Sequence, residues 1–280
     1  MTKIRIVTDS TVDLSEEIVH KYGIKIVPLT LSIDGKSFID RVEISPKEFM
    51  KKMEHSKELP KSSQPSAGAF QKVYDELGQD GSQIISIHMT GNMSGTVRSA
   101  ESAMSLTSSD VSVVDSRFIS KALSFQVVEA AIMAQAGASK EEILQRVTEV
   151  RESTHLFVVV DTLENLVKGG RIGKGRAMIG SLLNIKPIAS LANGEYTPVS
   201  KARSHSQVVK YLSNHFMENV KGKTIKAVGI VHADGLALAQ SLKEKILEKT
   251  GYQDITIEET TPIISTHTGK GAIGFMYYTE

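Results

Sequence analysis

The chain has 280 residues, of which 40% are hydrophobic, and its 33 basic and 32 acidic residues leave a net charge of +1. This length is sufficient for two domains with full cores, and the balanced charge provides no long-range attraction to nucleic acid or to an anionic membrane. Because the chain has no cysteine, disulfides, thiolate nucleophiles and cysteine metal sites are all excluded.

Strands and helices alternate through the first half of the chain. Residues 4–7 form a short apolar run typical of a strand covered on both faces, and the capping-box spacing of Asp13 and Glu16 predicts a helix that continues to Tyr22. Further strands are predicted over 24–33, 84–88 and 111–115, and further helices from Ser45, over 66–77, 94–106 and 119–136, and from Ser139. This order predicts a mainly parallel, doubly wound α/β sheet.

Polar residues gather at the ends of three of these strands, over residues 8–11, 88–96 and 115–116. The carboxyl ends of parallel strands share one edge of the sheet, and ligands of doubly wound proteins sit beyond that edge. We therefore expect a ligand there.

The second half has a different order of elements. Asn193-Gly194 is a hairpin signal between strands at 185–191 and 195–199, and a short helix is expected after a strand at 156–160. The remaining pattern predicts helices over 204–220 and 236–250 and strands over 225–232, 255–258 and 273–278. These elements predict an α+β domain with a mixed sheet. We place the boundary near Arg151, which gives domains 1–150 and 151–280, and we expect close packing because no low-complexity linker separates them.

One glycine motif matches a cofactor fingerprint only in its letters. Gly269–Gly274 has the spacing of a dinucleotide-binding loop, but that chemistry requires a helix after the loop, where pyrophosphate meets the helix N-terminus. The residues that follow are strand-like and the sequence ends at Glu280. The glycines are therefore expected to turn the chain into a last strand, and no nicotinamide or flavin cofactor is predicted.

Three other features leave alternatives open. Lys168–Arg176 fails the P-loop pattern but has four basic residues, so it is either an anion or nucleic-acid contact or a flexible surface loop. Asp9 follows a strand, where phosphatase nucleophiles occur, although a turn or helix cap is the simpler interpretation. The eight histidines show no metal-ligand spacing, so no metal site is predicted.

Two serine-rich segments carry more information. Residues 62–66 and 90–96 each lead into a predicted helix and offer hydroxyl groups beside free helix N–H groups, a combination suited to an anion. Plain capping by Ser66 and Ser94 is the alternative. Two such segments at one sheet edge favour an anion-binding site, and neither has the GxSxG elbow of an esterase.

A series of short motifs in a fixed order resembles the DegV family. The matching segments are Thr8–Leu14, Ser62–Ser66, Met93–Thr96, Val114–Ser116, Leu163–Ile172, Asn184–Pro187, His232–Asp234 and His267–Gly271. The resemblance implies a two-domain α/β protein that holds one long-chain fatty acid between its domains. It also implies a partner, because members of the family present the fatty-acid carboxylate to a separate ATP-binding kinase subunit and retain the acyl phosphate for phospholipid synthesis.

The resemblance also assigns residues to that site. Ser62 and Ser63 would donate hydroxyls to the carboxylate, with Ser94 and the Gly95 amide opposite and His267 joining the network. At position 62 the family often has threonine, whose hydroxyl serves the same purpose. Arg171 and Arg203 are candidates for the rim, where they would meet the kinase or the new phosphate.

On this interpretation the chain is a lipid-binding subunit with no ATP site, cofactor or metal of its own. The N-terminus has no signal-peptide pattern and no apolar run is long enough to span a membrane, so a cytoplasmic protein without stable membrane insertion is expected. The main alternative is a stand-alone hydrolase or phosphotransferase that uses Asp9 and the serine loops. A DNA-binding regulator that uses Lys168–Arg176 is the third, and the near-neutral charge disfavours it.

Overall fold

The computed structural model describes residues 3–178, 185–191 and 193–280. Its N-terminal sheet is parallel, with strands β1 (Ile4–Asp9), β2 (Lys25–Val27), β6 (Gln83–His88) and β7 (Val111–Asp115) in the order β2-β1-β6-β7. Helices α3 (Ala67–Gly78) and α4 (Thr96–Met104) cover one face, and α5 (Ser120–Gln135) covers the other together with α1 (Glu16–Tyr22). The doubly wound sheet is thus confirmed.

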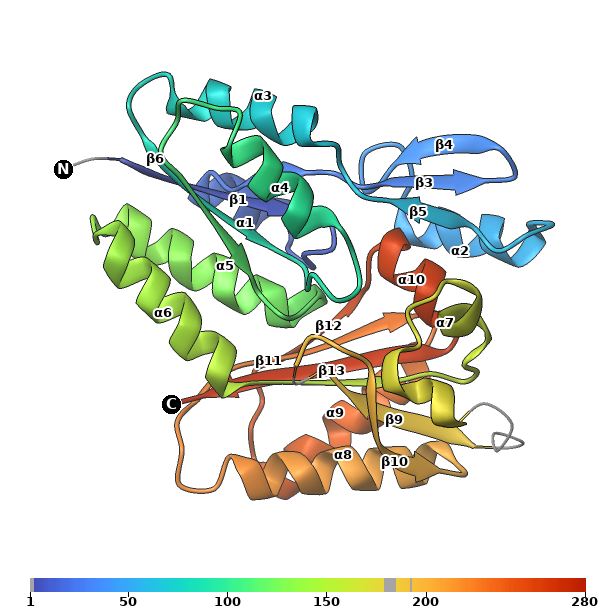
Figure 1. The fold of residues 1–280 in the computed structure, drawn as a ribbon. Helices are drawn as coiled ribbons and strands as arrows, with labels where there is room; N and C mark the ends of the chain where they lie inside the picture. Colours follow the sequence, from blue (N-terminus) through green and yellow to red (C-terminus); the bar gives the residue numbers. More distant parts are fainter. Residues whose placement is uncertain (1–2, 179–184, 192) are drawn as a thin grey trace.

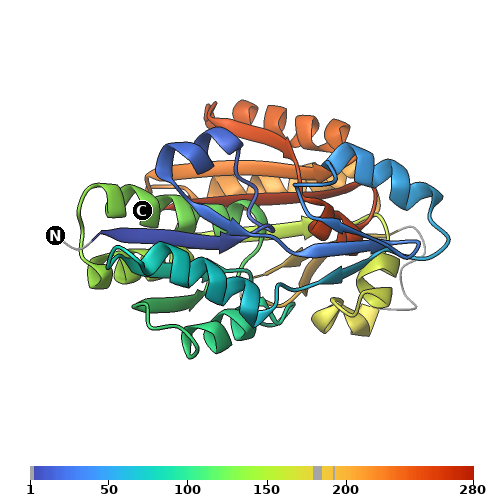
Figure 2. The ribbon, with the colours of Figure 1, turned by 90° about the horizontal axis from the view of Figure 1, so that it is seen from above.

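The predicted strand over residues 24–33 is in fact two strands in two different sheets. The chain leaves β2 at Val27 and enters β3 (Thr30–Ile33), which pairs with β4 (Lys36–Ile39) and β5 (Lys61–Ser63) in an antiparallel sheet. Pro28 lies at the break, and proline has no N–H for a ladder hydrogen bond. This small sheet and helix α2 (Pro46–His55) form a lobe beside the N-terminal sheet (Figures 1 and 2).

The C-terminal sheet is mixed, as predicted. Its strand order is β10-β9-β8-β13-β11-β12, where β11 and β12 are parallel and the other pairs are antiparallel. The strands are β8 (Thr154–Val159), β9 (Lys186–Ser190), β10 (Thr197–Ala202), β11 (Ile225–Ala233), β12 (Ile255–Glu259) and β13 (Ala272–Thr279). The predicted hairpin around Asn193-Gly194 is confirmed, since β9 and β10 pair across it.

One helical layer separates the two large sheets. Helix α5 contacts β1 and β6 on one side and β8, β11 and β13 on the other, and α6 (Lys140–Ser153) packs against α5 and β13. Helices α8 (His205–Asn219) and α9 (Leu236–Thr250) cover the far face of the C-terminal sheet (Figure 1). A single apolar cluster runs from Ile85 through Val127 to Leu156 and Met276. Each large sheet lies on its own side of residue 150, and the boundary near Arg151 stays a prediction.

Asp13 does not cap α1, contrary to the capping-box prediction. Ser15 is the N-cap and accepts a hydrogen bond from the Ile18 amide, whereas Asp13 is buried. The Asp13 carboxylate accepts hydrogen bonds from Ser120, from Thr260 Oγ1 at 2.8 Å and from the Thr261 amide at 3.2 Å. It therefore ties the β1–α1 link to the segment that precedes α10.

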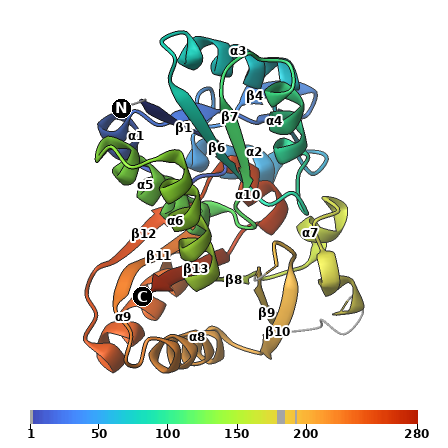
Figure 3. The same cartoon turned by 60° about the vertical axis from the view of Figure 1, so that its left-hand side comes forward.

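Helix α10 (Pro262–Thr268) was not predicted. It lacks an amphipathic repeat, because six of its seven residues are buried, and Pro262 occupies its first turn. It packs against α2 and the short helix α7 (Glu164–Lys168), so a C-terminal segment lies against the N-terminal lobe (Figure 3). After α10, Gly269 and Gly271 take positive φ values and lead into β13, as expected for a turn rather than a cofactor loop. No helix in the described ranges is both long and apolar enough to cross a membrane.

Candidate functional site

A pocket of about 330 Å³ lies where the N-terminal sheet edge, the small lobe and the C-terminal sheet meet. This volume is within the range of roughly 300–1,000 Å³ that is usual for small-molecule sites. Most of its lining is apolar, and these residues come from segments spread over the whole chain: Leu29, Met89, Met93, Ile119, Val158, Leu166, Leu191, Tyr196, Ile263 and Ile264. The polar lining consists of Thr11, Ser62, Ser63, Gln64, Ser94, Arg171, His267 and Thr268.

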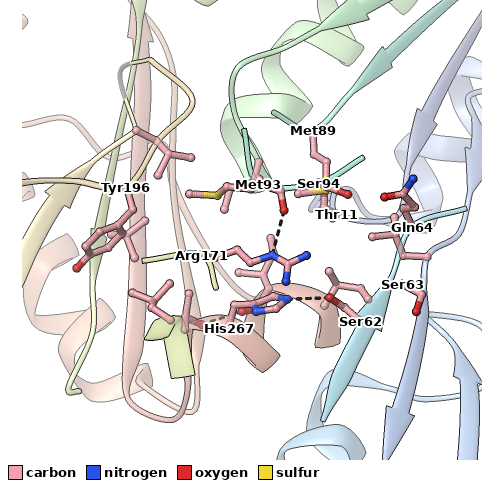
Figure 4. Close-up of a pocket in the computed structure, with 18 residues that line it drawn as sticks. Thr11, Ser62, Ser63, Gln64, Met89, Met93, Ser94, Arg171, Tyr196 and His267 are labelled. Atoms are coloured by element: carbon pink, nitrogen blue, oxygen red, sulfur yellow. Dashed lines mark hydrogen bonds between the residues drawn. The ribbon is translucent and has the colours of Figure 1, made fainter. Parts of the chain in front are cut away.

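The polar end of the pocket centres on Ser62 and His267. The Ser62 Oγ and the His267 Nε2 form a hydrogen bond of 2.8 Å (Figure 4). The contact exists because α10 packs against β3 and β5, which brings the end of α10 beside strand β5. Two residues that the sequence predicted for one site are thus adjacent in space.

The imidazole of His267 is neutral at ordinary pH. Burial, together with the positive charge of Arg171, lowers the pKa of His267 to about 4. Its Nδ1 has no hydrogen-bond partner among the described residues, and Gly169 lies so close that a Cβ there would meet Nδ1 at 2.3 Å. A neutral imidazole can donate or accept at Nε2, so Ser62 is free to point its hydroxyl hydrogen at a ligand.

Arg171 carries a positive charge to the same end of the pocket. Its Nε donates to the Met93 carbonyl at 3.0 Å and its Nη1 to the Gly169 carbonyl at 2.5 Å. Burial lowers the pKa of Arg171, and no carboxylate of the described chain forms an ion pair with it. A half-buried guanidinium with only carbonyl partners favours an anionic ligand.

The other serine-rich segment reaches the pocket through Ser94. The Ser94 Oγ lies 2.8 Å from Thr96 Oγ1 and accepts a hydrogen bond from the Thr96 amide at 3.2 Å. Gly95 is the N-cap of α4 and makes no side-chain cap, so Ser94 stands two residues before Thr96, the first residue of the helix. By contrast, Ser66 caps α3 through the Ala69 amide, as expected.

Ser63 lines the pocket beside Ser62 but turns its hydroxyl away from His267 (Figure 4), and Arg203 lies outside the pocket. Successive residues of a strand point to opposite faces, and in β5 the Ser62 hydroxyl turns toward His267 while the Ser63 hydroxyl turns away (Figure 4). Ser63 nevertheless lines the pocket, and donation by both hydroxyls to one carboxylate stays a prediction. Arg203 is exposed between β10 and α8 and does not line the pocket, so its role stays a prediction.

The segment Lys168–Arg176 does not form a phosphate loop. It spans the end of α7 and a 3₁₀ helix (Gly173–Met178), and Lys168 and Lys174 pair with Glu164 and Glu195. Its contribution to the pocket is Arg171.

Asp9 is a structural residue of the N-terminal domain. It is fully buried, and its carboxylate accepts hydrogen bonds from the Thr11 amide and hydroxyl and the Met89 amide, with His88 Nδ1 at 3.2 Å. Burial alone would raise the pKa of Asp9, but these partners bring it below its ordinary value. Since no oxygen is left for a substrate, the structure offers no support for Asp9 as a nucleophile.

Sequence reasoning missed three polar lining residues, Thr11, Gln64 and Thr268. Gln64 follows Ser62 and Ser63 in the matched segment, but nothing in the sequence indicates that its amide contacts the other serine-rich segment. The apolar lining could not be found either, because those residues share no periodicity in the sequence.

This chain is similar in sequence and in fold to known proteins over its full length. A family model described as an uncharacterised protein of the DegV family matches residues 3–280. A DegV domain-containing protein of Listeria innocua is 43% identical over 281 residues, with 100% of both chains covered. A Staphylococcus aureus relative with the same description is 40% identical and is covered to 99%, as is this chain.

Two solved structures have the same fold with full coverage of both chains. A DegV family protein from Thermus thermophilus, described by its fatty acid binding, has a TM-score of 0.94 and 31% identity. DegV of Bacillus subtilis, described as a fatty acid binding protein, has a TM-score of 0.91 and 29% identity. The family match and these relatives show that the chain belongs to the DegV family.

Proposed function

We propose that this protein binds one long-chain fatty acid, with its carboxylate at Ser62, Ser94 and His267 and its tail along the apolar lining of the pocket. The observation that carries the proposal is that one pocket combines a polar end at Ser62 and His267 with a mainly apolar lining. The fatty acid binding of the two similar structures supports it.

The energetics suit such a ligand. Burying an ionised carboxylate is very costly without partners, and hydrogen bonds from two hydroxyls, with the positive charge of Arg171 nearby, make the burial tolerable. The tail provides the affinity: ~14 methylenes at ~0.8 kcal/mol each contribute roughly 11 kcal/mol before the costs of association.

We further propose that the bound carboxylate is presented to a separate ATP-binding kinase subunit and that the acyl phosphate stays on this chain for phospholipid synthesis. Hydroxyls and a neutral imidazole hold the carboxylate without a close ion pair to a cation. One carboxylate oxygen is therefore left able to attack a phosphoryl group. The exposed Arg203 is the candidate contact for that subunit.

Native mass spectrometry tests the first proposal. Protein purified from bacteria is expected to carry one fatty acid, and delipidated protein to rebind palmitate or oleate. Ser94→Ala is expected to weaken retention of the fatty acid. A ligand-free protein with no affinity for either fatty acid would contradict the proposal.

The kinase proposal has a separate test. Loaded protein is mixed with ATP and an ATP-binding fatty acid kinase subunit, and acyl phosphate is measured by mass spectrometry. Product is expected only when both proteins are present. Acyl phosphate formed by this chain alone, or none with the pair, would refute it.

A further inference from the structure

Gln64 connects the two serine-rich loops at the polar end of the pocket. It lies in the link between β5 and α3, and its Nε2 donates to the Gly95 carbonyl at 3.2 Å and to the Ser99 Oγ at 2.9 Å. Both acceptors belong to the start of α4, directly after Ser94. The Gln64 side-chain amide thus connects the serine-rich segment of Ser62 to that of Ser94.

The absence of a side chain at position 95 fits this contact. Gly95 has φ −79° and ψ 8°, which other residues adopt without strain, so its backbone does not require glycine. A Cβ at this position would lie 2.1 Å from Gln64 Oε1 and 2.6 Å from its Cδ. Any larger residue at position 95 would therefore displace the Gln64 amide and break its two hydrogen bonds.

We propose that Gln64 is a positioning residue, which holds the Ser94–Gly95 segment against the end of strand β5. It thereby fixes the separation of the Ser62 and Ser94 hydroxyls that receive the carboxylate. The inference rests on the proposed fatty-acid function. A carboxylate presents its two oxygens at a fixed separation, so donors from two loops hold both only if the loops keep their spacing. Gln64 acts through Ser99 and Gly95, which do not line the pocket.

The test compares Gln64→Met, which keeps the side-chain length and removes both hydrogen bonds, with Ser99→Ala, which removes one of them without touching the pocket. The affinity of each delipidated variant is measured for palmitate and for hexadecanol, which has the same tail and no carboxylate. Gln64→Met is expected to lower palmitate affinity about tenfold, because two hydrogen bonds within the protein are lost and their partners bond to water instead. Ser99→Ala is expected to lower it about threefold, and both variants are expected to lower palmitate affinity more than hexadecanol affinity.

The double variant Gln64→Met with Ser99→Ala separates positioning from direct contact. If Gln64 acts through Ser99, the double variant binds palmitate as Gln64→Met does, because the second change removes a bond that is already lost. Ser102→Ala is the matched control, since Ser102 lies on α4 and its hydroxyl donates to the Arg98 carbonyl.

Several outcomes would overturn the inference. Additive losses in the double variant, or a normal Ser99→Ala beside a weakened Gln64→Met, would make Gln64 a direct ligand contact. An equal loss for palmitate and hexadecanol would indicate general damage to the fold. Failure of the proposed function itself is distinguishable, because the unaltered protein would then bind no palmitate.

Discussion

Ser62 and His267 are 205 residues apart in the sequence, and their side chains form a 2.8 Å hydrogen bond across the junction of the small N-terminal lobe and helix α10. The polar end of the pocket therefore exists only when both halves of the chain are folded and docked. Each of the two residues has its side chain directed by a different element, β5 for Ser62 and α10 for His267.

Successive side chains of β5 point to opposite faces of the strand, and this gives a direct test of the site. Ser62→Ala removes the hydroxyl that faces His267 and is expected to lower fatty-acid affinity roughly 10- to 100-fold, since a hydrogen bond to a charged group contributes roughly 1.5–3 kcal/mol. Ser63→Ala is the companion variant, since Ser63 also lines the pocket but its hydroxyl turns away from His267 (Figure 4). Affinity is measured by fluorescent fatty-acid displacement. Equal losses in the two variants would show that the carboxylate is not held from this face of β5.

Acidification is expected to destabilise the ligand-free protein through His267. Its pKa falls to about 4 in the folded state against 6.5 when unfolded, so the unfolded chain takes up the proton first. Stability is then fully present above pH 6.5 and is lost as the pH falls toward 4, by about 3 kcal/mol at most.

His267→Gln isolates this contribution from the other histidines. Burial also lowers the pKa of His155, His215 and His232, and their effects remain in the variant. Urea unfolding at pH 7.5, 6 and 4.5 is expected to show a smaller loss for His267→Gln than for the unaltered protein. Parallel pH profiles would mean that His267 is not buried in its neutral form.

Asp40 is expected to have the opposite pH dependence. It is fully buried, burial raises its pKa to about 7, and the Ser10 hydroxyl, the charge of Arg41 and the Ile263 amide oppose that rise while the charge of Asp13 adds to it. The folded state retains a proton that the unfolded chain loses near pH 3.8, so stability declines as pH rises from 3.8 through 7.

Asp40→Asn removes this titration and is expected to stabilise the protein at pH 8, by up to about 4 kcal/mol. Thermal unfolding at pH 5 and pH 8 measures the difference, with the exposed Asp254→Asn as control. A variant that is less stable than the unaltered protein at pH 8 would show that Asp40 is held there in its charged form.

Sequence patterns predicted the two sheets and most helices well, and the site only in part. Strong periodicity and caps specified α3 and α9, whose starts and ends agree within a residue or so with the predicted ones, and the start of α6. Helix α10 and strand β5 were missed because tertiary packing, rather than local pattern, stabilises them. For the same reason no pattern could reveal that Asp13 bonds to Thr260 rather than capping its own helix.

The resemblance to a family supplied what local patterns could not, namely that His267 belongs with Ser62 and Ser94. It did not resolve the orientation of neighbouring side chains. Ser62 and Ser63 are equivalent as sequence letters, and only the register of β5 against Leu31 and Thr30 of β3 distinguishes them.

The hairpin between β9 and β10 is hydrogen-bonded to the β6–α4 loop at the side of the pocket. We expect this contact to slow ligand release. The Thr90 hydroxyl, fully buried, donates to the Gly194 carbonyl at 2.9 Å, and Asn92 Nδ2 donates to the Asn193 carbonyl at 3.0 Å. Residues on both sides of the contact, Met93 and Tyr196, line the pocket, so separating the two segments would open its wall.

Thr90→Val keeps the side-chain shape and removes the buried hydrogen bond, leaving the Gly194 carbonyl without its partner. Unfolding free energy is expected to fall by about 1–2 kcal/mol, and fatty-acid dissociation to accelerate several-fold, because part of the barrier to opening is lost. Thr148→Val is the control, since its hydroxyl donates to the Leu144 carbonyl within α6 and its loss leaves the pocket wall intact. Stopped-flow transfer of a fluorescent fatty acid to vesicles measures the rate. If both variants release ligand at the same rate, the hairpin contact stabilises the fold without gating the pocket.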